Sequence, residues 1–213
     1  PVGTTRQLFV DERLIETKEN VSLVLHPPVA REVVLKAEKP WEGQSMTYPT
    51  VFHDGKQFRL YYRASGPKIG SPVVKQEGDK KQMMWSYTAL ALSDDGIHWT
   101  RPEFGVVAFG GSKKNNLVWP PAGEEGSDVL PFLDKNPEAK PEERYKALAS
   151  VGEFAVIALA SPDGIHWKRM QKEPVLSHLP VDPMMDPPNL AFWDENRKEY
   201  VAYLRCWLNY RIR

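Results

Sequence analysis

Ser93-Asp-Asp-Gly-Ile-His-Trp-Thr-Arg101 recurs 68 residues later as Ser161-Pro-Asp-Gly-Ile-His-Trp-Lys-Arg169, with seven of the nine positions identical. A short apolar stretch precedes each copy, at residues 88–92 and 156–160. An Asp-Gly pair after such a stretch is typical of a tight turn in which the Gly adopts a positive φ. The pattern therefore predicts a strand, a turn and a second strand that begins at His-Trp, with the Trp packed against the apolar face.

A further hairpin is predicted before each copy of this motif. The first joins residues 48–52 to 57–63, and the second joins 128–132 to 144–149. A third hairpin of the same kind joins 189–193 to 200–205. The three first strands align at Phe52, Phe132 and Phe192. Each motif together with its hairpin gives four antiparallel strands in about 60–80 residues, which is the size of a propeller blade.

Repetition of a four-stranded unit predicts an all-β fold and, within it, a β-propeller. We expect N-terminal strands and a lead-in at residues 1–43, where the apolar segments 7–10 and 21–25 would add one or two strands. Residues 44–213 would form a partial propeller of about 2.5 blades. Blade one is expected at 44–110, blade two at 115–176 and an incomplete blade three at 182–213. The rest of the ring would then lie in a longer chain or a partner chain; a β-sandwich with similar hairpins is the alternative.

Composition excludes several functional classes. Lys+Arg and Asp+Glu are both 28, so the chain lacks the basic excess of a nucleic-acid-binding protein. The longest clean apolar run, at residues 154–160, is far too short to span a membrane as a helix, so no membrane association is predicted. Cys206 is the single cysteine, which excludes an internal disulfide framework and a cysteine-based zinc site.

The succession of strand, Asp-Gly turn, aromatic-rich strand and Ser-x-Asp-Gly-x-His-Trp over residues 44–213 resembles the five-bladed β-propeller glycosidases. This superfamily includes glycoside hydrolase families 32, 43, 68 and 117. The resemblance implies a five-bladed propeller that acts on a poly- or oligosaccharide through paired carboxylates in its central funnel. In that chemistry one carboxylic acid protonates the leaving oxygen and a second carboxylate acts as base or nucleophile. A secreted or periplasmic location is expected for such a protein.

The resemblance implies three catalytic candidates. Asp128 opens the first strand of the second hairpin, where the family places an Asp that stabilises the transition state. Asp186 stands just before the first strand of the third hairpin. Tyr48-Pro49 replaces the Asp-Pro of the family in the first hairpin, which puts the ordinary mechanism in doubt, and Glu42 is the nearest carboxylate that could substitute. Asp128 could equally be a residue that simply begins a strand. For Glu42 the commonest alternative is an exposed loop residue without a catalytic role.

Candidate binding residues are aromatic or cationic. Aromatic rings suit the C–H faces of sugars, and Arg suits a carboxylate or sulfate on an acidic sugar. The candidates are Trp41, Tyr48, Trp119, Arg63 and Arg205. Core packing is the alternative for the tryptophans, and ion pairs between blades are the alternative for the arginines. The histidines show no metal-ligand spacing, so no metal site and no cofactor are predicted, with a structural Ca²⁺ left open.

Two functions follow from these residues. The resemblance favours a glycoside hydrolase, and the acidic and aromatic residues at the starts of the first strands argue against a purely structural propeller. The alternative is a non-catalytic propeller that binds carbohydrate or protein, and Tyr48 in place of an acid favours it. Asp95 and Asp163 recur within the repeated motif, so we interpret both as structural residues.

Overall fold

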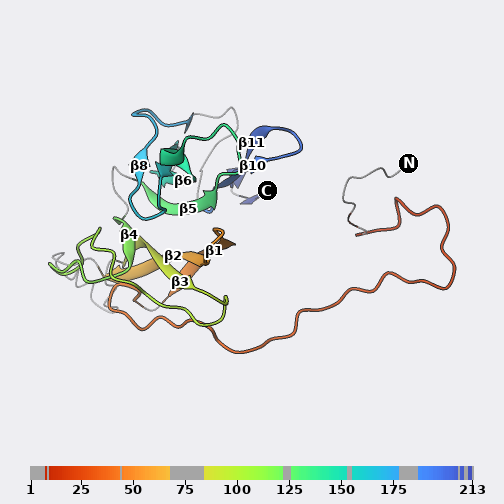
Figure 1. Ribbon diagram of the computed structural model, residues 1–213, viewed down its shortest axis with the longest axis horizontal. Coiled ribbons are helices and arrows are strands. Elements are labelled where there is room, and N and C mark those ends of the chain that lie inside the picture. Colours follow the sequence, from red (N-terminus) through yellow and green to blue (C-terminus); the bar gives the residue numbers. More distant parts are fainter. Residues whose placement is uncertain are drawn as a thin grey trace. The chain divides into compact units, whose positions relative to one another are not determined.

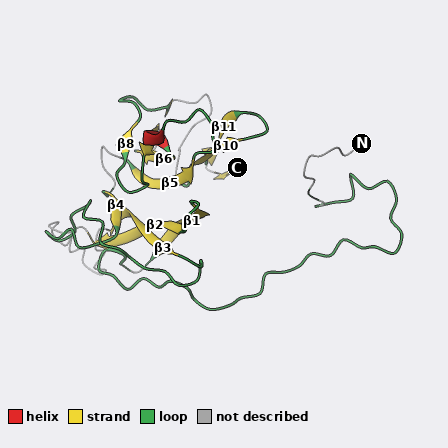
Figure 2. Ribbon diagram, viewed as in Figure 1, coloured by secondary structure: helices red, strands yellow, loops and turns green. Residues whose placement is uncertain are grey.

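The computed structural model describes residues 8, 10–43, 45–67, 84–121, 126–152, 155–177, 187–205, 207–208 and 211–212. The chain divides into two units, Pro1–Val33 and Val34–Arg213. The second unit carries all the described strands, and the only helix among its described residues is a single 3₁₀ turn, η1 (Pro141–Glu143), so the fold is all-β as predicted (Figure 2). The described residues include no helix long and apolar enough to cross a membrane.

Two antiparallel sheets follow one another along the chain (Figure 1). The first has the order β1 (Met46–His53), β2 (Phe58–Pro67), β3 (Met84–Ser93) and β4 (Leu117–Trp119). The second has the order β5 (Ser127–Leu133), β6 (Tyr145–Val151), β7 (Ala155–Ser161) and β8 (Lys168–Arg169), with β9 (Leu176–Ser177) also paired to β7. Neither sheet closes on itself.

Two hairpins complete the described chain. The first consists of β10 (Leu190–Asp194) and β11 (Glu199–Tyr203), and the second of β12 (Trp207–Leu208) and β13 (Arg211–Ile212). The three hairpins predicted from the sequence are therefore confirmed as β1–β2, β5–β6 and β10–β11. One boundary differs: β4 pairs with β3 of the first sheet, whereas the sequence placed residues 115 onward in the second repeat. The chain travels from Thr100 to Leu117 before it returns to β3, and no local pattern marks that return.

The repeated motif forms the same turn twice. Gly96 and Gly164 have φ values of 77° and 73°, as the Asp-Gly pattern predicts. Oδ1 of Asp95 accepts hydrogen bonds from the backbone N–H groups of Ile97 and His98, each at 2.8 Å, and Asp163 does the same with the equivalent two residues of its own turn. The structural role of both aspartates is thus confirmed. These bonds keep His-Trp within the turn, so the next strand starts at Lys168, later than predicted.

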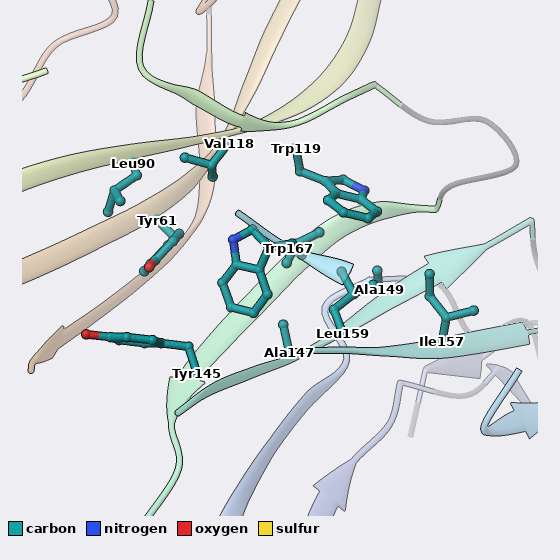
Figure 3. Packing of buried hydrophobic residues seen from close by; sticks show 11 residues of the cluster. Tyr61, Leu90, Val118, Trp119, Tyr145, Ala147, Ala149, Ile157, Leu159 and Trp167 are labelled. Carbon is teal, nitrogen blue, oxygen red and sulfur yellow. The ribbon is translucent and has the colours of Figure 1, made fainter. Parts of the chain in front are cut away.

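The main apolar core lies between the two sheets (Figure 3). Tyr61, Leu90 and Val118 enter it from the first sheet, and Trp167 and Leu159 enter it from the second. Figure 3 shows the Trp167 ring between the labelled side chains of the first sheet and those of the second. The other face of the first sheet is covered by a second cluster, to which Leu35, Trp41 and Phe109 contribute. The other face of the second sheet packs against Ala191 and Leu204 of the third repeat.

A polar joint links each repeat to the next. Asp54, at the end of β1, accepts hydrogen bonds from Arg59 Nε at 2.5 Å and from the Tyr145 hydroxyl of the second sheet at 3.0 Å. At the equivalent place, Asp134 accepts a bond from Lys146 Nζ and one from the Tyr200 hydroxyl of β11, both at 2.7 Å. The contact between the first and second sheets is therefore repeated between the second sheet and the β10–β11 hairpin.

The N-terminal unit differs from expectation. The strand expected at residues 21–25 is not formed, and residues 10–33 contain no strand. The side chains of Val21, Leu23, Val24 and Leu25 are exposed. Two residues of the other expected strand, Gln7 and Phe9, lie outside the described residues.

Candidate functional site

The first strands of the three repeats line one cavity. Its volume is about 570 Å³, and its walls come from β1, β5 and β10. The lining consists of residues 48–53, 130–133 and 190–192, together with Lys135 and Pro188. Because the repeats are joined in the same way, equivalent positions of three segments far apart in sequence face the same space. This cavity is the candidate functional site.

Phenylalanine occupies the same place in all three walls. Phe52, Phe132 and Phe192 each line the cavity, in strands that pair in equivalent register with their neighbours. The sequence aligned these residues but assigned them no role; their recurrence at one position of every repeat was the signal. Tyr48, Thr50, His53 and Lys135 add polar groups to a wall that is otherwise apolar. Among the lining residues there is no carboxylate.

Tyr48, Arg63 and Asp128 meet at one end of these strands. Arg63 forms a two-point ion pair with Asp128, with Nε 2.6 Å from Oδ1 and Nη2 2.8 Å from Oδ2. Its guanidinium also lies 4.9 Å from the centre of the Tyr48 ring. The Asp128 side chain is 1% exposed, and Oδ2 accepts a further hydrogen bond from Ser127 Oγ at 2.9 Å. The structure thus brings together three of the predicted site residues, with the carboxylate paired with Arg63 and hydrogen-bonded through Oδ2 to Arg63 and Ser127.

The backbone is strained at two of these residues. Tyr48 and Asp128 have φ values of 52° and 56°, a left-handed conformation that is unfavourable for a residue with a side chain. Each sits where the register of its first strand shifts against the second strand, between residues 47 and 50 and between 127 and 130. A bulge of this kind redirects a side chain out of the normal alternation of a strand. Strained positions are found most often where function requires a particular orientation.

Glu42 lies away from the cavity, in a closed ion-pair network. It is fully buried and pairs with Arg101 at 2.6 Å, and it accepts hydrogen bonds from the Tyr62 hydroxyl and two backbone N–H groups. Burial alone would raise the pKa of Glu42, but the hydrogen bonds from Tyr62, the backbone and Arg101 outweigh it and hold the pKa below its usual value. Glu42 is therefore an ionised group that fixes the segment before β1 to the first sheet, with no surface for a substrate to reach.

Trp41, Trp119 and Arg205 are not among the lining residues of the cavity. Trp41 packs in the second apolar cluster and donates a hydrogen bond from Nε1 to Asn116, and Trp119 is a core residue that donates to the Gly126 carbonyl. Arg205 donates from Nη1 to the carbonyl of Pro187 at 2.8 Å, just before β10. Asp186 lies outside the described residues. The described residues contain no group of three or more His, Cys, Asp or Glu side chains that could hold a metal ion.

Comparisons with known proteins give one structural likeness. No protein-family model matches the chain, and no curated protein matches it. A glycosyl hydrolase from Bacteroides ovatus, known from a crystal structure, is similar over 80% of this chain and 69% of its own, with 16% sequence identity and a TM-score of 0.33. A TM-score this low does not establish a shared fold, so the likeness assigns neither a fold nor an activity to this chain.

Proposed function

We propose that this chain binds carbohydrate in the cavity lined by β1, β5 and β10. The observation that carries the proposal is the presence of Phe52, Phe132 and Phe192 at one equivalent position in all three walls. Aromatic faces suit the C–H faces of sugar rings, and the Tyr48 hydroxyl, His53 and Lys135 offer hydrogen-bonding groups for sugar hydroxyls. The volume of about 570 Å³ is within the range of ordinary small-molecule sites.

The architecture that suits this proposal is a β-propeller of the five-bladed type. Residues 44–213 would form part of the ring, and residues 1–43 would lead into it. Support comes from the repeated joint, because the first sheet packs on one face of the second and the β10–β11 hairpin packs on the other. A sandwich would bury one face of each of two sheets. Repeated stacking in one direction, with the first strands around a cavity, favours radial repetition.

A glycoside hydrolase is the second candidate, and the strained Asp128 favours it. Hydrolysis needs two carboxyl groups roughly 5–10 Å apart across the scissile bond. Asp128 is held by Arg63, and Glu42 is closed inside its own ion-pair network. Catalysis would therefore depend on Asp186 as the partner of Asp128. Binding is the better supported function because the described cavity wall offers aromatic rings and hydroxyl partners without a carboxylate pair.

The test is a binding titration against a panel of neutral and acidic oligosaccharides, followed by calorimetry. Phe132→Leu removes a cavity ring while keeping an apolar side chain of similar size, and Phe109→Leu is the matched control, in the second apolar cluster and outside the cavity lining. We expect Phe132→Leu to weaken binding about fivefold, equivalent to roughly 1 kcal/mol for the lost ring contact. Phe109→Leu should bind as the wild type does.

Two results would overturn the proposal: no member of the panel binds, or Phe132→Leu and Phe109→Leu bind equally well. Product release should be followed in the same panel. Release that is abolished by Asp128→Asn would place hydrolysis ahead of simple binding, whereas binding without product supports the proposal as stated.

A further inference from the structure

A stacked aromatic pair of the first repeat joins the two sheets. Phe52 and Tyr61 stack with their ring centres 5.8 Å apart and their planes 20° apart. Tyr61 is fully buried, and its hydroxyl donates a hydrogen bond of 2.9 Å to the carbonyl of Gly164, in the turn of the second sheet. Arg59 donates beside it to the carbonyl of Asp163 at 2.8 Å. The pair thus docks onto a Ser-x-Asp-Gly turn.

The third repeat contains the same pair, and no such turn packs against it among the described residues. Phe192 and Tyr203 stack with their ring centres 6.1 Å apart and their planes 18° apart. Leu190 pairs with Tyr203 across the hairpin, as Thr50 pairs with Tyr61, so the two tyrosines are equivalent. Tyr203 is 62% exposed and Phe192 is 37% exposed. The tyrosine of this pair is therefore buried in the first repeat and exposed in the third, while Phe52 is half-buried.

A second turn of the same kind lies at residues 93–99, and the side chain of its Ile97 is exposed. Residues 93–99 have the same internal hydrogen bonds as residues 161–167, including the bond from the Trp Nε1 to the Gly carbonyl. In the second turn, Ile165 packs against the core between the sheets. In the first turn the equivalent Ile97 is 44% exposed. A Cβ built on Gly96 meets nothing nearer than 3.7 Å, whereas one built on Gly164 would collide with the Tyr61 hydroxyl.

We propose that the Phe192–Tyr203 pair of one chain docks onto the turn at residues 93–99 of a second copy, head to tail. The Tyr203 hydroxyl would donate to the Gly96 carbonyl of the partner copy, as Tyr61 donates to Gly164 within one chain. Two copies joined in this way use different surfaces, so the contact is heterologous and can extend to further copies.

Val201 makes this contact weaker than the internal joint. It stands where Arg59 stands in the first sheet, because Phe192 pairs with Val201 as Phe52 pairs with Arg59. The hydrogen bond to the Asp carbonyl is therefore missing from the proposed contact. The association is expected to be reversible and to depend on protein concentration.

Sedimentation velocity over a range of concentrations tests the proposal. The wild-type mass should rise above 24.3 kDa as concentration increases. Tyr203→Asp removes the docking pair, and Ile97→Asp blocks the turn, so each variant alone should stay at the mass of one chain. An equal mixture should form a one-to-one complex, because each variant keeps the surface that the other has lost. Tyr203→Phe, which loses only the hydroxyl, should weaken association about fivefold.

Leu25→Asp is the control, because Leu25 is 91% exposed and lies in neither surface. It should associate as the wild type does. The proposal is overturned if the wild type stays at one chain mass, if Leu25→Asp abolishes association, or if the mixture of the two single variants remains monomeric while circular dichroism shows both to be folded.

Discussion

The turn at residues 93–99 and the turn at residues 161–167 have the same internal hydrogen bonds and different surroundings. In both, the Asp carboxylate holds two backbone N–H groups, and the Trp ring donates to the Gly carbonyl. In the second turn, Gly164 is buried against Tyr61 and Arg59 of the first sheet, whereas Ile97 of the first turn is 44% exposed. The comparison shows that the motif itself specifies the local shape, while the packing of the neighbouring repeat determines what each residue contributes to stability.

The glycine pair should give the largest difference between the two turns. Gly96→Ala and Gly164→Ala both place a side chain at a positive φ, which costs about 1 kcal/mol in either turn. At Gly164 the new Cβ would also collide with the Tyr61 hydroxyl and come within 2.7 Å of Arg59 Nη1. We expect Gly164→Ala to lower the free energy of unfolding by about 3 kcal/mol and Gly96→Ala by about 1 kcal/mol. Urea unfolding measures the free energy of unfolding of both variants. Equal losses of stability would mean that Tyr61 does not pack against the second turn.

The aspartate pair should give a smaller difference that depends on pH. Burial alone would raise the pKa of Asp163, but its hydrogen bonds with His166, Ile165 and Ser161 lower it from 3.8 to about 2. Because the pKa is lower in the folded chain, the stabilisation is complete above pH 3.8 and disappears as the pH falls through about 2. Asp163→Asn should therefore lower the free energy of unfolding by roughly 1 kcal/mol at pH 7, after allowance for solvent screening. The loss should disappear below about pH 2.

Asp95→Asn is the matched control for this pH profile, because Asp95 makes the same hydrogen bonds in the turn at residues 93–99. Thermal unfolding of both variants and the wild type between pH 2 and pH 7 gives the comparison. A cost for Asp163→Asn that stays constant down to pH 2 would show that the loss comes from packing and owes nothing to the charge.

The sequence was sufficient for the features that depend on neighbouring residues. The two turns and the three hairpins follow from Asp-Gly pairs and alternating apolar residues, and the structure confirms them. Strand β4 was placed in the wrong repeat because its partner, β3, is separated from it by a long connection without a recognisable pattern. Non-local pairing of this kind leaves no mark within a short window of sequence.

The site was less accessible to sequence reasoning for a related reason. Glu42 looked like a carboxylate in a loop, but its partners Tyr62 and Arg101 are 20 and 59 residues away, and together they bury it. The strained backbone at Tyr48 and Asp128 depends on a register shift against the second strand, which the sequence does not reveal. The alignment of Phe52, Phe132 and Phe192 was visible in the sequence, but only the packing of the repeats shows that these residues share a cavity.

The central claim is that the first repeat docks through Tyr61 onto the turn of the second repeat, and that this joint helps to bring the first strands around one cavity. A double-mutant cycle between Tyr61→Phe and Gly164→Ala tests it most directly, because removal of the hydroxyl makes room for the new methyl group. We predict that the double variant is more stable than the sum of the single losses by at least about 1 kcal/mol, while Tyr61→Phe combined with Gly96→Ala is additive. Additivity in both cycles would contradict the docking of Tyr61 onto the second turn and, with it, the shared cavity.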